Sequence, residues 1–232
     1  TPLYSSAASD VYKRQLMGDY LYSKAFSLLA DRRRWELVRI LAEVTQQMSV
    51  GEIVQYRVRH DTSVNEERYM ELIFRKTASL FSAACECGAV LSGNGNRERL
   101  SGFGGRLGLA FQITDDLFDY LAVDDGIGKP TASDFSDGRV TLPLLTSLGN
   151  APAAASERVG DLFRNGFDRR EHWDEVVTFV REYGGIEYAM RRARDLGEQA
   201  KRFLRDLSPS PSRDALCMAA DYVVGRVEPY YR

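Results

Sequence analysis

Apolar positions recur at helical spacing along most of the chain. From Met17 to Ala30 apolar side chains return every three or four residues, and Trp35 to Met48 repeats the pattern. Such spacing places them on one face of an α-helix. No stretch keeps the alternation of apolar and polar residues that a half-buried strand shows. The pattern therefore predicts an all-α chain, with a helical stretch opening at Gly51, another helix starting at Thr141, and further helices over 64–91, 97–123, 172–183, 185–207 and 212–230.

Two of the predicted helices have features of a central position. The helix over 64–91 is apolar nearly all round, which is typical of a helix with neighbours on every side. Ser63 is its predicted N-cap, and Glu66 completes a capping box three residues later. The helix over 97–123 is expected to make close helix contacts at glycine positions, which are Gly102, Gly104, Gly105 and Gly108.

Composition limits the classes of function. The 232 residues are 44% hydrophobic and carry a formal net charge of −2, enough for one sizeable core and no sign of a nucleic-acid binder. Three cysteines and two histidines favour neither a disulfide framework nor a zinc site. No apolar run has the length of a membrane span, and no signal peptide is visible. We expect a cytoplasmic protein without stable membrane insertion.

Residues 1–15 look foreign to the remainder of the chain. The stretch SSAASDVYKRQ within them resembles the conceptual translation of a transposase-type sequencing adapter. We interpret residues 1–15 as a non-native, adapter-like leader and exclude them from reasoning about the fold. Natural coding is then expected from about Leu16, with one all-α domain over residues 16–232.

Asp115, Asp116 and Asp119 form an acidic cluster inside an apolar segment. In a helix Asp115 and Asp119 lie one turn apart and Asp116 is three residues from Asp119, so all three can point one way, with Gln112 on the same face. Such like charges destabilise a helix by roughly 0.2–0.5 kcal/mol per pair, whereas converging carboxylates suit a hard cation. The cluster predicts a magnesium-diphosphate site. The alternative is a solvated acidic face.

Three basic residues stand where they could contact an anion. Lys76 lies within the apolar central helix, where an unpaired ammonium would cost several kcal/mol unless its stem reaches solvent. Lys129 follows the acidic helix between a glycine and a proline, a place that also suits an ordinary surface loop. Arg139, in the string DFSDGRVTLP, is expected to pair with Asp134 or with a ligand.

The chain resembles the trans-isoprenyl diphosphate synthases, which make linear polyprenyl diphosphates by head-to-tail condensation. The resemblance covers residues 16–232 and is carried by six segments in this order: GDYLYSKAF from Gly18, GEIVQY from Gly51, KTASLF from Lys76, FQITDDLFDY from Phe111, GKP from Gly128 and TLPLL from Thr141. It implies a bundle of long helices around a central substrate cavity, of the isoprenoid synthase type. It also implies a homodimer and two substrates, an allylic diphosphate and isopentenyl diphosphate.

The acidic cluster acquires a role through this resemblance. Asp115, Asp116 and Asp119 match the family's second aspartate-rich motif, whose carboxylates bind Mg²⁺ on the allylic diphosphate. Lys76 and Lys129 match lysines that contact that diphosphate.

Polar neighbours acquire roles in the same way. Thr77 and Gln112 match residues that line the reacting centre with Lys76 and face the developing allylic cation. Arg139 stands where the family often has a lysine and is expected to contact the diphosphate. Diphosphate leaves readily only when its charge is neutralised, and the cation left behind needs a dry apolar cavity.

Other family features are absent from the printed sequence. We find no first aspartate-rich motif followed by two arginines, and no basic residues upstream of it to hold isopentenyl diphosphate. We therefore interpret the chain as an N-terminally truncated fragment and expect it to be inactive alone.

The sequence leaves two alternative functions and the product length open. The chain could be a non-catalytic partner subunit of a heteromeric prenyl synthase, or a terpene cyclase-like enzyme of related fold. The downstream motif typical of cyclases, with Asn or Asp, a hydroxyl residue and Glu, does not occur. The contexts of GEIVQY and KTASLF lean toward long-chain synthases, but the product length stays open.

Overall fold

The computed structural model describes residues 6–93, 95–121, 133–164 and 172–231. This described part consists of helices and turns and contains no strand, which confirms the all-α expectation. None of the described helices is long and apolar enough to cross a membrane. The chain divides into two compact units, Thr1–Glu43 and Val44–Arg232.

The first unit contains helix α1, Ser6–Asp31, and the beginning of helix α2, Trp35–Arg57. Much of the apolar surface of α1 is exposed, including Tyr20 and Leu21. Helix α1 continues through residues 15 and 16 without a break, so the predicted end of the leader does not coincide with a helix boundary.

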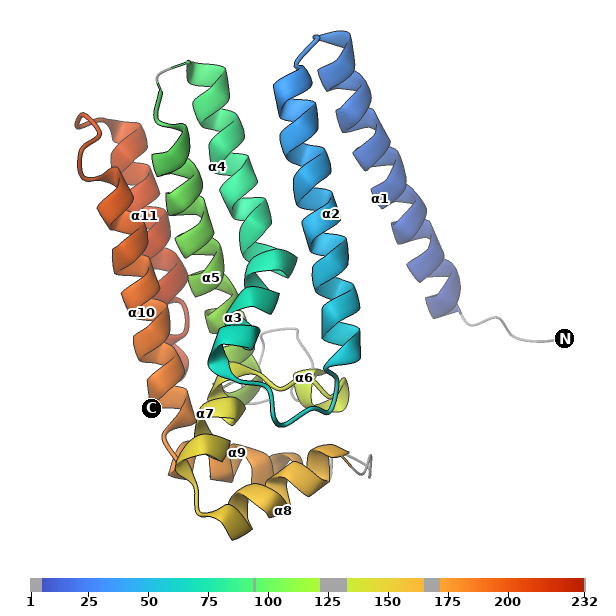
Figure 1. Ribbon diagram of the computed structural model, residues 1–232, viewed down its shortest axis with the longest axis vertical. Helices are drawn as coiled ribbons and strands as arrows, with labels where there is room; N and C mark the ends of the chain where they lie inside the picture. Colours follow the sequence, from blue (N-terminus) through green and yellow to red (C-terminus); the bar gives the residue numbers. More distant parts are fainter. Residues whose placement is uncertain (1–5, 94, 122–132, 165–171, 232) are drawn as a thin grey trace, which may run out of the picture. The chain divides into compact units, whose positions relative to one another are not determined.

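The second unit contains the end of α2 and the remaining helices. Helix α5 lies between α4 and α10, and α11 packs on α10 (Figure 1). In chain order the helices are α3 (Glu66–Ile73), a π-helical turn η1 (Phe74–Ala78), α4 (Ser79–Ser92), α5 (Arg97–Leu121), α6 (Ser133–Ser136), α7 (Leu142–Asn150), α8 (Ala153–Arg164), α9 (Trp173–Glu182), α10 (Gly185–Leu204), α11 (Pro211–Gly225) and a 3₁₀ turn η2 (Glu228–Tyr230).

The predicted helix over 64–91 differs from the structure at its start and in its middle. The N-cap is Asn65, whose side chain accepts a hydrogen bond from the Arg68 N–H at 2.9 Å. Ser63 instead donates to the Asp61 carboxylate, so the predicted capping box is wrong. The helix is also interrupted at Phe74–Ala78 by the π turn, which leaves α3 and α4 as separate pieces.

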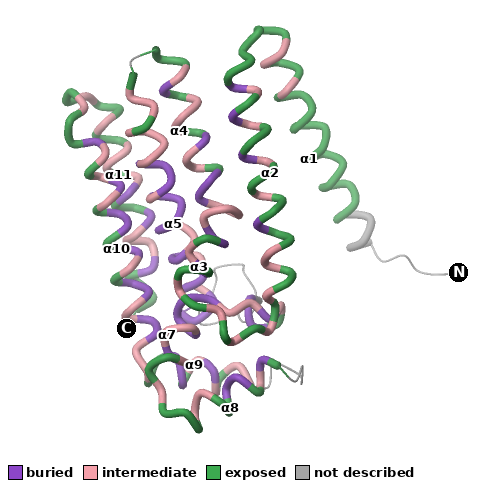
Figure 2. The backbone as a smooth tube through the Cα atoms, in the orientation of Figure 1, coloured by how far each residue is buried: buried purple, intermediate pink, exposed green. Residues whose placement is uncertain are grey.

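Helix α5 forms the centre of the core. Phe103, Ile113 and Leu117 on this helix are completely buried, and purple dominates its middle in Figure 2. A Cβ at Gly104 would stand 2.3 Å from the Phe81 carbonyl oxygen, and one at Gly108 would stand 2.5 Å from the Ala78 Cα. The two positions accept only glycine because η1 and α4 approach the α5 backbone so closely, as the sequence predicted.

The segment that follows α6 is fixed against the end of α2. The His60 N–H donates to the Gly138 carbonyl oxygen at 2.8 Å, and both residues have a positive φ. Phe135 is buried and its ring contacts those of Phe163 and Trp173. These contacts hold the residues from Asp134 onward beside the carboxyl end of α5.

Candidate active site

A pocket opens in the second unit between the end of α2, α3, η1, α5 and the segment after α6, with about 610 Å³ of empty space when the open solvent at its mouth is included. Cationic side chains outnumber carboxylates in its wall, so the pocket is electrostatically suited to an anion. The cations are Arg59, Arg68, Lys76 and Arg139, and the carboxylates are Asp116 and Asp134.

Lys76 projects into this pocket from the π turn. Its Nζ donates to Gln55 Oε1 at 2.5 Å and lies 3.1 Å from Glu52 Oε1, and a quarter of the side chain is exposed. A Cβ at Gly51 would stand 2.9 Å from the Lys76 backbone nitrogen, so glycine permits this close approach. The GEIVQY segment therefore supplies both the gap beside the turn and the partners of its lysine.

A partly buried chain of hydrogen bonds links Thr77 to the acidic helix. The Thr77 hydroxyl donates to Gln112 Oε1 at 2.7 Å, and Gln112 Nε2 donates to Asp116 Oδ1 at 2.8 Å. The Tyr69 hydroxyl donates to the other oxygen, Asp116 Oδ2, at 2.7 Å. Because each donor meets an acceptor, the orientations of Thr77 and Gln112 are fixed by their neighbours.

Tyr69 donates a hydrogen bond at the end of this chain. Burial raises the pKa of its hydroxyl well above the ordinary 10.0, and the nearby Asp116 carboxylate raises that pKa further. A hydroxyl that keeps its proton favours an ionised acceptor. Asp116 is 5% exposed, and the hydrogen bonds from Tyr69 and Gln112 offset part of the cost of burying its carboxylate.

Asp119 and Arg139 fix α6 and the segment that follows it. Asp119 Oδ2 accepts the Asp134 N–H at 2.7 Å, and Arg139 donates to the carboxylates of Asp134 and Asp137. The expected pairing of Arg139 with Asp134 is therefore confirmed. The Arg139 Nε is buried and has no hydrogen-bond acceptor in the described part of the chain, which leaves one guanidinium donor for a ligand.

Asp115 lies on a different face of α5. It is half-buried, whereas Asp116 and Asp119 are buried. The guanidinium of Arg226, just beyond α11, covers this face: it lies 4.2 Å from the Phe111 ring centroid and donates to the Thr114 hydroxyl. Burial lowers the pKa of Arg226, and the Asp115 charge opposes that shift.

The structure thus divides the predicted site residues into groups. Lys76, Gln112, Asp116 and Arg139 line one pocket, and Thr77 is bonded to it through Gln112. Asp119 caps α6 and Asp115 faces Arg226. Within the described ranges, no three His, Cys, Asp or Glu side chains are placed to share one metal ion. Lys129 lies outside the described residues.

Sequence reasoning missed several residues of the pocket. Tyr69 is four residues before Ile73 and seven before Lys76, so regular helical spacing would place all three on one face. This spacing could have identified Tyr69 as a pocket residue. Gln55 and Glu52 carried no such signal, because their contact with Lys76 depends on how α2 packs against the π turn. Arg59 and Arg68 enter the wall from two different elements.

Comparison with known proteins assigns the family. A family model described as polyprenyl synthetase matches residues 7–180. The chain is 32% identical over 213 residues to the octaprenyl diphosphate synthase of Haemophilus influenzae, covering 91% of this chain and 64% of the relative. It is 34% identical over 217 residues to a short chain isoprenyl diphosphate synthase of Methanothermobacter thermautotrophicus, with 91% and 66% covered.

Solved structures agree with these matches. A polyprenyl synthase from Caulobacter crescentus, crystallised with calcium and isoprenyl diphosphate, superposes with a TM-score of 0.86 and 31% identity. The comparison covers 91% of this chain and 65% of that one. The fold is therefore that of the isoprenyl diphosphate synthases, and the chain spans slightly less than two thirds of the length of these relatives.

Proposed function

Because the chain belongs to the polyprenyl synthetase family, we propose that it provides the allylic-diphosphate part of a chain-elongating prenyltransferase site. The observation that carries the proposal is the cation-rich pocket beside the Thr77–Gln112–Asp116 chain. The reaction would join isopentenyl diphosphate head-to-tail to an allylic diphosphate. The allylic carbon–oxygen bond breaks, a carbon–carbon bond forms, and the isopentenyl unit loses a proton.

Lys76 and Arg139 are the proposed diphosphate ligands among the described residues. Lys76 already has two oxygen partners on its ammonium, and a diphosphate oxygen would replace or join them. The buried Arg139 Nε supplies a second donor. Charge-assisted hydrogen bonds of this kind stabilise the leaving anion more strongly than neutral ones. Lys129 is proposed as a third ligand on the basis of the family resemblance.

Thr77 and Gln112 are proposed to face the allylic carbon. Their hydroxyl and amide dipoles are held by Asp116 and Tyr69, so they need little reorganisation when positive charge develops. Neither side chain is a strong nucleophile, which suits a reaction whose cation must survive until the second substrate attacks.

Asp115, Asp116 and Asp119 are the proposed ligands of Mg²⁺. An ionised carboxylate has about four lone-pair sites, so Asp116 retains acceptor capacity beside Tyr69 and Gln112. Mg²⁺ next to phosphates commonly takes one or two carboxylates and completes its shell with phosphate oxygens and water. One or two carboxylates of the acidic turn would fit that pattern; Asp116 lines the pocket, and Asp115 is the least buried of the three. Bound there, the ion would neutralise the leaving diphosphate.

The relatives support the proposed cation and diphosphate, and they differ among themselves in product length. The Caulobacter crescentus protein was crystallised with a divalent cation and an isoprenyl diphosphate, a ligand pair that the acidic turn and the pocket would suit. The names of the two relatives differ in product length, octaprenyl and short chain. We retain the homodimer as a proposal, which sedimentation equilibrium would test.

A binding experiment tests the proposed site directly. The ligand is a farnesyl diphosphate analogue whose bridging oxygen is replaced by sulfur, titrated calorimetrically with Mg²⁺ or with EDTA. We expect binding only with Mg²⁺, and a roughly tenfold or greater loss in Lys76→Gln, because a charge-assisted bond is removed. Lys201→Gln is the matched control: like Lys76, Lys201 has two side-chain oxygen partners, here the carboxylates of Glu198 and Asp221, and its side chain is 26% exposed. Equal losses in both variants would refute the assignment.

Turnover is a separate question from binding. Because the printed sequence lacks the family's first aspartate-rich motif, we propose that the chain alone elongates farnesyl diphosphate little or not at all. Incubation with Mg²⁺ and isopentenyl diphosphate, followed by product analysis, tests this. Efficient elongation would overturn the expectation of inactivity. Binding of the analogue without elongation would also suit the alternative of a non-catalytic partner subunit.

A further inference from the structure

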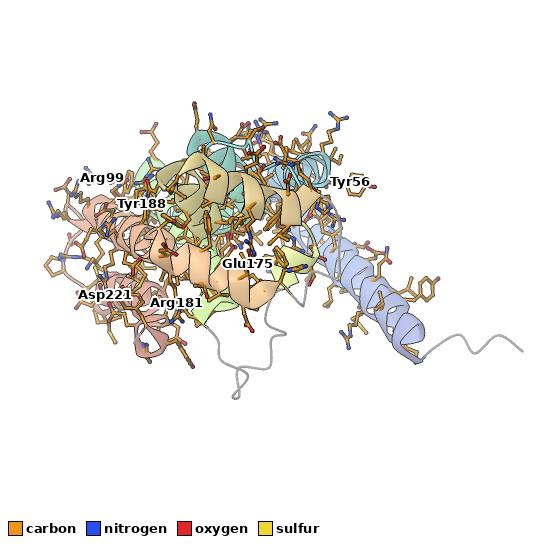
Figure 3. The ribbon with its side chains drawn as sticks, turned by 90° about the horizontal axis from the view of Figure 1, so that it is seen from below. Tyr56, Arg99, Glu175, Arg181, Tyr188 and Asp221 are labelled. Atoms are coloured by element: carbon orange, nitrogen blue, oxygen red, sulfur yellow. The ribbon has the colours of Figure 1, made fainter. Side chains whose placement is uncertain are left out.

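A second polar groove lies at the amino end of α5, and none of the roles proposed above uses it. It runs between α5 and the end of α10 and has about 850 Å³ of empty space when the open solvent above it is included. Arg99 and Arg106 come from α5, and Gln199, Arg202 and Phe203 come from α10, followed by Asp206. In Figure 3 Arg99 lies at the outer edge of the helices.

The groove forms because α5 has a gap in its side-chain surface. Arg99 and Arg106 are seven residues apart and therefore share a face, with Gly102 between them. A Cβ at Gly102 would stand only 2.6 Å from the Phe203 ring. The ring accordingly packs on the bare helix backbone and forms a floor between the two arginines. Arg202, next to Phe203, adds a third guanidinium from α10.

The charge of the groove is opposite to that of the chain. Three arginines face one carboxylate, whereas the whole sequence has a formal net charge of −2. Arg99 pairs with Asp206 at 2.6 Å, but both side chains are well exposed. Arg106 is half-buried, and neither its side chain nor that of Arg202 has a hydrogen-bond or ion-pair partner in the described ranges. The groove therefore has two cations whose charge no neighbour offsets.

We propose that this groove binds a phosphoryl group. Guanidinium groups match phosphate oxygens with paired hydrogen bonds, and three of them around an aromatic floor can surround an anion larger than a carboxylate. Arg106 and Asp115 are nine residues apart, or roughly 14 Å along a helix axis, so the groove is distinct from the proposed active site. Two sources supply this chemistry: free diphosphate and the phosphate of an anionic lipid headgroup.

Titration with inorganic diphosphate tests the proposal. The measurement uses EDTA and the Lys76→Gln background, so that neither Mg²⁺ nor the active-site lysine contributes. We expect binding that weakens roughly tenfold in Arg202→Gln, since one charge-assisted pair is lost. Arg205→Gln is the control, because Arg205 is exposed, three residues away and outside the groove. Arg106→Gln should act like Arg202→Gln once circular dichroism shows it to be folded.

Asp206→Asn gives a test in the opposite direction. Removing this carboxylate releases Arg99 and removes repulsion, so diphosphate affinity should rise about two- to fivefold. Equal weakening by Arg202→Gln and Arg205→Gln, or an unchanged affinity in Asp206→Asn, would overturn the proposal in favour of diffuse charge attraction. These outcomes do not depend on prenyltransferase activity.

Vesicle sedimentation distinguishes the two sources. Phosphatidylglycerol vesicles and phosphatidylcholine vesicles are compared with the wild-type chain, Arg202→Gln and Arg205→Gln. Retention on phosphatidylglycerol that only Arg202→Gln weakens identifies a headgroup site. Diphosphate binding without vesicle retention identifies a site for a free anion. Absence of both kinds of binding refutes the phosphoryl site.

Discussion

The two ends of α5 carry opposite charges in opposite surroundings. At the carboxyl end Asp116 and Asp119 are buried, and each accepts hydrogen bonds from defined donors. At the amino end Arg99 and Arg106 face an open groove, where the one ion pair is exposed. The carboxylates at one end of α5 therefore depend on hydrogen bonds from other parts of the protein. The arginines at the other end face a groove where water can supply their hydrogen bonds.

The different surroundings predict whether substitution of each set of charges changes stability, ligand binding or both. A buried polar group left unpaired costs about 1–3 kcal/mol, so substitutions at the acidic end should change stability as well as binding. Exposed charge pairs contribute little to stability. Substitutions in the groove should therefore change ligand binding and leave stability almost intact. The expected loss of stability is largest at Asp116 and smallest at the rim of the groove.

Asp116→Ala should lower the free energy of unfolding by about 3 kcal/mol. The change leaves the Tyr69 hydroxyl and the Gln112 amide without their acceptor inside the protein. Urea unfolding measures the effect. Asp116→Asn is the control: its side-chain oxygen can still accept from Tyr69, so it should lose less. A loss below about 1 kcal/mol in the alanine variant would show that the network is not what stabilises this end of α5.

Tyr69→Phe should cost about 1 kcal/mol at neutral pH, since one buried hydrogen bond is lost. The pKa of this hydroxyl is raised in the folded state, so the unfolded chain loses the proton first as the pH rises past the ordinary 10.0. Stability that depends on the protonated hydroxyl is complete below that pH and declines above it. The variant should show a shallower decline in alkaline urea titrations.

Tyr56→Phe is the control for this pH dependence. Tyr56 is 71% exposed, and Figure 3 shows it at the outer side of α2. Its removal should leave the alkaline decline unchanged. If both tyrosine variants flatten the decline equally, burial is not its cause.

Asp115→Asn should separate binding from stability. The side chain is half-buried and lies on the face covered by Arg226, so we expect the free energy of unfolding to change by at most about 0.5 kcal/mol. Mg²⁺-dependent binding of the farnesyl analogue should nevertheless weaken roughly tenfold, because a proposed metal ligand is lost. Thermal unfolding and calorimetry give the two readouts. Normal binding at limiting Mg²⁺ would remove Asp115 from the metal site.

The double variant Arg99→Gln, Asp206→Asn should be the least perturbed in stability. It removes the exposed ion pair at the rim of the groove without leaving a buried partner, and we expect a change of at most about 0.5 kcal/mol in urea unfolding. A much larger loss would show that this end of α5 depends on its charges as the acidic end does.

Helical periodicity predicted the fold class and most of the helices. It did not predict local details, namely which residue caps α3 and where the helix is interrupted. Ser63 and Asn65 are both good N-cap residues, and the sequence pattern favoured Ser63. Asp61 engages the Ser63 hydroxyl and N–H, which leaves Asn65 to cap the helix. The interruption at Phe74–Ala78 was not foreseen, since the string FRKTA contains neither glycine nor proline to indicate it.

The acidic motif was recognisable from the sequence, whereas the different surroundings of its members were not. Successive residues on a helix differ by about 100° in direction, so Asp115 and Asp116 meet different neighbours. Tyr69 and Gln112 hold Asp116, and Arg226 covers the face of Asp115. Both sets of partners come from packing between segments that are distant in sequence, and residue spacing within one helix contains no information about them.

The π turn at Phe74–Ala78 amounts to one extra residue accommodated within a helix. Deleting a single residue there would let α3 and α4 join as one regular helix, a change that helical propensity alone would favour. The same deletion would rotate everything on one side of it by about 100°, so that Tyr69 and Thr77 could no longer both reach the Asp116–Gln112 pair. Sequence insertions and deletions at this turn are therefore expected to be constrained by chemistry more than by folding.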